Sequence, residues 1–143
     1  MQLSASAPSD MVSDVLDYYP DTQLALQLWT IYVKSVDPVL KILHIPTVQS
    51  TVIAAILDPR SASSSTVALV FAIYFAAITA LCHDNNEHIN LPCEKLVLLK
   101  RYQIALDRLL LVTNLMNRPE ITALQALAIY VVSPNAGHVP LTR

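Results

Sequence analysis

The sequence is almost free of glycine: Gly137 is the only one among 143 residues. Loops that cradle phosphate groups, and the sharp turn that presents a nucleophilic serine, need several glycines. At those positions the backbone must adopt positive φ or approach the ligand closely. The chain therefore has no dinucleotide fingerprint, no P-loop and no nucleophile elbow, and the enzyme classes built on these loops are excluded.

Charged residues are also scarce, at 14% of the chain against about 25% in ordinary soluble domains. Nine Lys and Arg face eleven Asp and Glu, which gives a net charge of −2. Because nucleic-acid binders concentrate cations to neutralise phosphates, we expect no direct nucleic-acid binding. Two cysteines, Cys82 and Cys93, are too few for a disulfide framework and lack CxxC spacing, so a reducing compartment is expected.

Hydrophobic residues, in contrast, make up 54% of the chain, and the mean hydropathy is +0.47. Such an excess is typical of a membrane protein, an obligate oligomer or part of a larger core, each of which buries apolar surface against a partner. Residues 1–19 carry three aspartates, no basic cluster and no continuous apolar stretch, so they do not form a signal peptide. We therefore expect the chain to stay inside the cell.

Apolar residues recur at steps of three and four, which predicts an all-α fold of five or six helices in an irregular bundle. The predicted segments are residues 21–36 with Asp21 as N-cap, a short turn over 37–43 with Asp37 as cap and Pro38 at its first position, 47–57 capped by Thr47, 67–82, 93–116 and 119–131. The helical region thus covers residues 21–132. A flexible segment, 1–20, precedes it, and an aperiodic tail, 133–143, follows it.

The stretch from Val67 to Cys82 contains 16 uncharged residues and could be read as a membrane span. A span needs about 20 apolar residues, and this stretch has neither a basic flank nor an aromatic belt at both ends. Its alanines also suit close packing between helices. We therefore favour a buried central helix and expect no membrane partner.

Cys82, His83, His88 and Cys93 place two thiols and two imidazoles within a dozen residues, the ligand types of a tetrahedral zinc site. Their spacing matches no zinc motif, and the alternative is two small buried cysteines beside solvated histidines. His44 ends a predicted turn, where an imidazole can bond the last carbonyls. We predict no catalytic, cofactor-binding or metal-binding residue and no enzyme activity, and leave metal binding by the four residues open.

Lys100, Arg101 and Arg108 form a small basic face on the predicted helix 93–116. Glu94 and Asp107 lie on the same helix and oppose them in charge. This mixture is typical of a solvated helix surface and not of a nucleic-acid patch.

The run LWTIYVKSVDPVLKILHIPTVQ, residues 28–49, resembles the opening of the fungal-specific transcription factor domain, the middle homology region of fungal binuclear zinc-cluster regulators. The match rests on Leu28, Trp29, Tyr32, Val36, Pro38, His44, Pro46 and Thr47. The blocks ALVFAIYFAAITAL (68–81) and LQALAIY (124–130) follow in the expected order, so the resemblance spans residues 19–132. It implies a large all-α regulatory domain that lies C-terminal to a six-cysteine DNA-binding cluster in nuclear proteins.

This chain departs from the family pattern in two ways. It has no six-cysteine cluster, so zinc-dependent DNA binding does not carry over, and the family domain is usually much longer. We expect the N-terminal part of a larger helical domain, truncated, with apolar surface that further helices would cover. The matching residues are interpreted as structural.

Three functional hypotheses follow. The leading one is a transcription-regulator-like helical domain that acts in the nucleus through protein contacts, with a full-length regulator or a second copy as partner. The second is a stand-alone small helical protein, such as a homodimer, that binds or converts an apolar small molecule in a pocket lined by Phe71, Tyr74 and Phe75. The third is a gene fragment without selected activity.

Overall fold

The computed structural model describes residues 15–83, 89, 91–112 and 120–133, and over these ranges it contains helices and no strand. Five helices there have ten residues or more: α2 (Thr22–Ile31), α4 (Ile45–Leu57), α5 (Ser64–His83), α6 (Lys95–Val112) and α7 (Ile121–Val132). The shorter elements are η1 (Leu16–Tyr18), the π-helical turn η2 (Tyr32–Val36), α3 (Asp37–Leu40) and η3 (Pro59–Ser61). The all-α prediction is confirmed.

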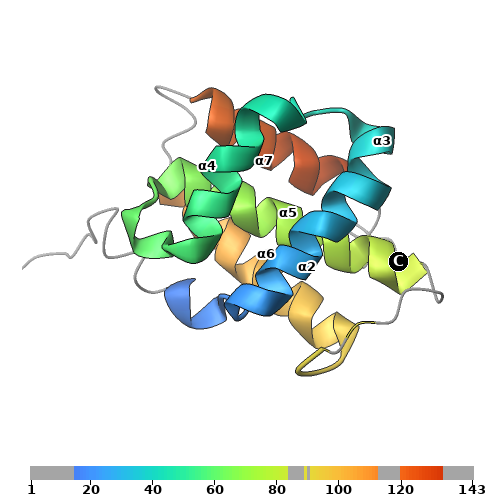
Figure 1. Ribbon diagram of the computed structural model, residues 1–143. Helices are drawn as coiled ribbons and strands as arrows, with labels where there is room; N and C mark the ends of the chain where they lie inside the picture. The colour runs from blue at the N-terminus through green and yellow to red at the C-terminus, as the bar shows by residue number, and fades with distance from the viewer. Residues whose placement is uncertain (1–14, 84–88, 90, 113–119, 134–143) are drawn as a thin grey trace, which may run out of the picture.

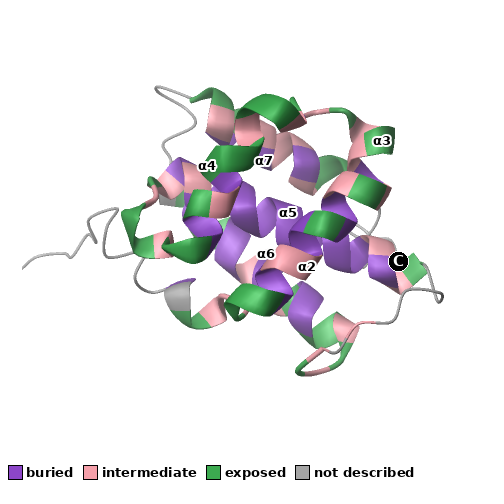
Figure 2. Cartoon of the chain, in the orientation of Figure 1, coloured by how far each residue is buried: buried purple, intermediate pink, exposed green. Residues whose placement is uncertain are grey.

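Helix α5 forms the centre of the molecule (Figure 1), and α2, α4, α6 and α7 all pack against it. Fifteen of its 20 residues are buried, on every side of the helix. A helix enclosed on all sides must be apolar all round, because an unpaired charge inside a protein is costly to bury. The uncharged stretch thus becomes the core helix, and Figure 2 shows it buried along most of its length.

Of the described helices, α5 alone is long and apolar enough to cross a membrane, and 83% of its most apolar stretch is buried within the protein. The surrounding helices account for this hydrophobicity without lipid. The predicted helix 67–82 is confirmed, although α5 begins earlier, at Ser64.

Helix α2 begins as the sequence predicts. The Oδ1 atom of Asp21 accepts a hydrogen bond of 2.8 Å from the backbone N–H of Leu24, so the carboxylate satisfies one of the free donors at the helix N-terminus. Leu28 and Trp29 then face the core. The Trp29 ring stacks on that of Tyr32, with centroids 6.0 Å apart. Leu28, Trp29 and Tyr32, which carry part of the family resemblance, therefore have a structural role.

The turn after η2 differs from the prediction. Val36, not Asp37, occupies the cap position, and Asp37 and Pro38 are the first helical residues of α3. The turn ends early because Lys41 adopts a left-handed conformation with φ of 52°, so it does not extend to Leu43.

Helix α4 also begins earlier than predicted. It starts at Ile45 with His44 as its N-cap residue, so His44 opens this helix and does not close the preceding turn. Pro46 lies in the first turn, where its missing N–H costs nothing. The predicted cap Thr47 is inside the helix, and its Oγ1 hydrogen-bonds His44 Nδ1 at 2.6 Å.

The apolar residues of the predicted helix 93–116 give an expected buried stripe of Leu96, Leu99, Tyr102 or Gln103, Leu106, Leu110 and Thr113. Leu99, Tyr102 and Leu106 are buried as expected. Leu96, expected on the buried face, is 68% exposed, whereas Leu98 and Leu109 are buried. The predicted C-terminal end of this helix, up to Met116, falls outside the described residues. Before α2, Val15 is buried and the Tyr19 ring contacts Phe71 edge-on, with centroids 4.8 Å apart, so this part of the N-terminal segment packs against the helical region.

We expect Asp21→Ala to lower the free energy of unfolding by about 1 kcal/mol, because the N-terminal donors of α2 lose their cap. Urea unfolding followed by circular dichroism measures this change. Gln23→Ala, an exposed position on the same helix, is the control and should change stability by less than about 0.5 kcal/mol. Equal effects of the two variants would contradict the cap.

Candidate functional site

The sequence-predicted zinc candidates lie around the end of α5 and the start of α6. Cys82 and Cys93 are partly buried, His83 is exposed, and His88 lies outside the described residues. Over the described ranges, no group of three or more His, Cys, Asp or Glu is placed to hold a metal ion. The neighbouring Lys95 has a structural role, because its Nζ donates to the Leu81 carbonyl at 2.7 Å and caps the C-terminus of α5.

The Cys82 thiol is poorly suited to nucleophilic chemistry. Burial raises its pKa, and the nearby Lys95 ammonium lowers it only in part. The thiolate is the reactive form, so a thiol held protonated at neutral pH is a weak nucleophile and a weak metal ligand.

The basic face on α6 serves a structural purpose. The guanidinium groups of Arg101 and Arg108 lie 5.9 and 5.5 Å from the centre of the Tyr18 ring, and an Arg101 Nη2–H donates to the Asp17 carbonyl at 3.1 Å. Two of the three cations therefore hold η1 against α6 through cation–π contacts.

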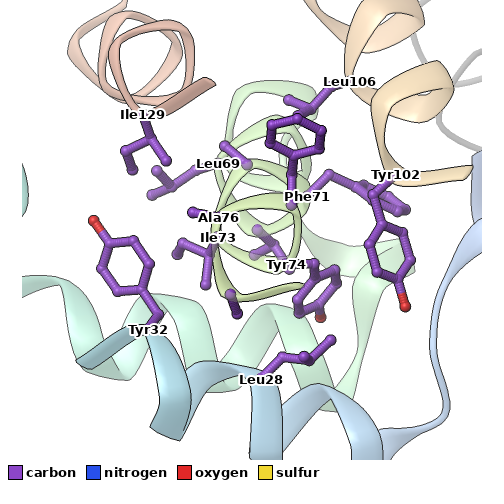
Figure 3. Packing of buried hydrophobic residues seen from close by; sticks show 14 of the residues in the cluster. Leu28, Tyr32, Leu69, Phe71, Ile73, Tyr74, Ala76, Tyr102, Leu106 and Ile129 are labelled. Atoms are coloured by element: carbon purple, nitrogen blue, oxygen red, sulfur yellow. The ribbon is translucent and has the colours of Figure 1, made fainter. Parts of the chain in front are cut away.

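The aromatic residues proposed as a ligand pocket fill the core instead. Phe71, Tyr74 and Phe75 are fully buried. Phe71 and Tyr74 pack against Tyr102 of α6, with ring centroids 6.0 and 5.7 Å apart (Figure 3). Phe75 contacts Tyr130 of α7 edge-on at 5.2 Å. These rings occupy the space that an aromatic-lined ligand pocket would need, and none of them lines the grooves described below.

Several tyrosine hydroxyls in this core have no hydrogen-bond partner among the described residues. The Oη atoms of Tyr19, Tyr32, Tyr74 and Tyr102 are all buried and unpaired. Burial raises the pKa of Tyr74 well above its usual value, and the neighbouring Tyr19 and Tyr102 add to the shift. The phenol groups are therefore kept neutral by the core and contribute packing area in place of reactivity.

The surface has a groove at each end of α7. At its C-terminal end, Val132 and Ser133 line an apolar groove of about 320 Å³ with Val39 and Leu40 of α3 and Ala76 of α5. At its N-terminal end, Ile121, Thr122 and Gln125 line a second groove, of about 290 Å³. Its other residues are Leu69 of α5 and His44, Thr47, Val48 and Thr51 at the start of α4.

Helix α7, which borders both grooves, and helix α4, which borders the second, contain no Asp, Glu, Lys or Arg in their 25 residues. Yet α7 is a surface helix: Ile121 is 70% exposed, Val131 54% and Leu124 41%. Its buried face consists of Ala123, Ala126 and Ile129. The helix therefore has two apolar faces, only one of which is covered by the described part of this chain.

The sequence predicts the apolar residues Ile121, Leu124, Leu127, Ala128 and Val131 along the last helix, but the structure buries the opposite side, and Ile121, Leu124 and Val131 are exposed. The segment 121–132 is uncharged, and that feature alone distinguishes it from an ordinary surface helix, which carries charge on its outer face. The candidate functional surface is thus the outer side of α7 with its two flanking grooves.

We expect Tyr74→Phe to raise the free energy of unfolding by up to about 1 kcal/mol, because it removes a buried hydroxyl that has no partner among the described residues. Tyr130→Phe is the contrasting variant. It should lower stability by about 0.5 kcal/mol, because the Tyr130 hydroxyl donates to Asp107 Oδ1 at 2.9 Å. Urea unfolding at pH 7 measures both, and a clear loss of stability in Tyr74→Phe would contradict the unpaired hydroxyl.

The tyrosines also predict alkaline unfolding. Burial, with the hydrogen bond to Asp107, raises the pKa of Tyr130 to about 12, and burial raises the pKa values of Tyr19, Tyr32, Tyr74 and Tyr102. A phenol whose pKa is higher in the folded state stabilises that state fully below the unfolded pKa of about 10, and less as the pH rises further. The free energy of unfolding should therefore fall above about pH 10, with a shallower slope in Tyr74→Phe. A flat profile between about pH 8 and pH 11 would contradict this.

The chain is similar to several fungal regulators. It is 32% identical to the transcriptional regulator nsrM of Aspergillus novofumigatus over 120 residues, which are 84% of this chain and 17% of that protein. It is 32% identical to the aurofusarin cluster transcription factor aurR2 of Gibberella zeae over 115 residues, or 80% of this chain and 17% of aurR2. It is also 32% identical to the C6 finger domain transcription factor nscR of Arthroderma gypseum over 133 residues, or 92% of this chain and 19% of nscR.

No family model matches the chain, and no solved structure matches it. The aligned region spans less than a fifth of the length of each of these three relatives. Within that region the similarity covers most of this chain. The chain is therefore related to a region of fungal transcription factors.

Proposed function

We propose that this chain is a transcription-regulator-like helical domain that acts through protein–protein contacts in the nucleus and does not bind DNA itself. The observation that carries the proposal is the uncharged, exposed apolar face of α7 between two grooves. The cores of protein interfaces are depleted in charge in the same way. The similarity to transcription factors supports a regulatory role for such contacts.

The charge distribution supports the absence of direct DNA contact. DNA binding needs a cationic surface that releases counterions from phosphates. Here Arg101 and Arg108 are engaged with Tyr18, and the net charge of the chain is −2. The chain also has two cysteines, fewer than a six-cysteine cluster requires.

A non-enzymatic role fits the same chemistry. The relatives are transcription factors, and the aromatic core is filled by its own side chains. Cys82 is held as a thiol. The apolar groove at the C-terminal end of α7 offers hydrophobic contact, in which partner side chains can be anchored.

The proposal is tested by a tethering assay in fungal cells, with the full chain fused to an unrelated DNA-binding domain upstream of a reporter. We expect expression to change several-fold relative to the DNA-binding domain alone. Leu124→Glu should remove that change, because it places a charge on the apolar face. Leu96→Glu, at an exposed leucine on α6, is the matched control and should retain the effect.

The proposed absence of DNA binding is tested with the purified chain, by fluorescence anisotropy of labelled duplex DNA. We expect no binding tighter than about 100 µM at about 150 mM salt, the weak end of non-specific affinity. Binding at about 1 µM that weakens steeply as salt rises would contradict it.

A further inference from the structure

The outer face of α7 has a pattern that points to its occupant. Ile121, Leu124, Ala128 and Val131 follow one another at steps of three, four and three residues. This is the spacing of the a and d positions in a helix-pairing seam. Ala123, Ala126 and Ile129 occupy the opposite side, against α5. Ile121, Leu124 and Val131 are exposed and Ala128 is half-buried, so the seam lies on the outer side of α7.

We propose that this seam binds α7 of a second copy of the chain, in an antiparallel, two-fold symmetric arrangement. The inference rests on the proposed function and specifies the partner of its surface. In an antiparallel pair centred on position 126, Ile121 faces Val131 of the second copy, and Leu124 faces its Ala128. Each large side chain then meets a smaller one, which allows the two helices to interdigitate closely.

Charge favours a second copy over a partner of ordinary surface composition. Helices α4 and α7 contribute no Asp, Glu, Lys or Arg, so two copies of this face meet without like-charge repulsion. Glu120 lies at the N-cap of α7, and its carboxylate accepts a hydrogen bond from the Ser65 hydroxyl of the same chain. The exposed carboxylate keeps its charge, but in the antiparallel pair it lies level with position 132 of the second copy, at the opposite end of the seam from the other Glu120.

The size of the face sets the expected strength. The seam lies on α7, which is about 18 Å long and about 10 Å wide, and the neighbouring α4 is about 20 Å long and exposes uncharged polar side chains such as Thr47, Gln49 and Ser50. Together the two helices offer a footprint of about 400 Å², of which only the α7 half is apolar. Val39, 79% exposed on α3, extends the surface beyond the C-terminal groove. Such a face is at the small end of specific interfaces, where complexes are weak and reversible. We therefore expect a monomer–dimer equilibrium and not an obligate dimer.

Sedimentation equilibrium of the full chain at concentrations from about 5 to about 500 µM tests the proposal, with circular dichroism to verify helicity. The wild type should show a concentration-dependent dimer. Leu124→Glu and Ala128→Lys should each raise the dissociation constant by about 100-fold, because each buries an unpaired charge in the seam. Leu96→Glu, on α6 and outside the seam, should leave the dissociation constant unchanged.

Mixing the two seam variants tests the orientation. In the antiparallel register, the glutamate introduced by Leu124→Glu in one molecule faces the lysine introduced by Ala128→Lys in the other. The second contact of the symmetric pair keeps Leu124 opposite Ala128. The mixture should therefore form a heterodimer although each variant alone is monomeric. A second pair, Leu124→Glu with Leu124→Lys, should associate less well, because these positions are offset along the two helices.

A wild type that stays monomeric at about 500 µM would overturn the proposal. So would an Ala128→Lys and Leu124→Glu mixture that fails to associate. The tethering assay separates this failure from that of the proposed function: a monomer that still changes reporter expression, sensitive to Leu124→Glu, removes the second copy as occupant but keeps the regulatory role. A dimer without any reporter effect supports the α7 seam and overturns the regulatory role.

Discussion

The burial of α5 on every side is the constraint on which the rest of the structure depends. A 20-residue helix without Asp, Glu, Lys or Arg cannot be stable in water unless other helices cover it on all sides. In this chain α2, α4, α6 and α7 together provide that cover. Each must present an apolar face inward, which explains why the overall composition is so hydrophobic for a chain of this length.

The covering helices meet this demand in different ways. Helix α6 has an apolar inner face and carries five charged residues, so it behaves as an ordinary amphipathic surface helix. Helices α4 and α7 carry none. The exposed side chains of α4 are nevertheless mostly polar, such as Thr47, Gln49 and Ser50, so it is the outer face of α7 whose composition resembles the core of an interface. The uneven distribution of charge, more than any single residue, is what indicates where a partner would bind.

How much could be predicted depends on how local each signal is. The central helix and the Asp21 cap were predictable, because an uncharged 16-residue stretch and an Asp before a periodic segment act within one element. The predicted start of α4 at Thr47 was wrong, because Pro46 fits the first turn of a helix and the helix therefore begins before it, at Ile45. The predicted stripe on α6 was wrong at Leu96, because neighbouring leucines allow more than one register.

The candidate site was harder to predict than the fold. Phe71, Tyr74 and Phe75 are aromatic whether they line a pocket or fill a core, and only their contacts with Tyr102 and Tyr130 decide between the two. In α7, the predicted stripe that contains Ile121, Leu124 and Val131 faces outward, because nearly every residue of the helix is apolar and periodicity alone cannot say which side packs against α5.

The arrangement within α7 explains how an exposed apolar helix can remain firmly attached. Ala123 and Ala126 are fully buried, and Ile129 points towards the side of α5 that carries Leu69 (Figure 3). Small inner residues bring two helix backbones close together, so contact is gained without large inner side chains. The Phe75–Tyr130 ring contact, together with the hydrogen bond from Tyr130 to Asp107, then fixes α7 against α5 and α6. Because the attachment uses the inner face and Tyr130, the larger side chains on the outer face can bind a partner without being needed for the fold.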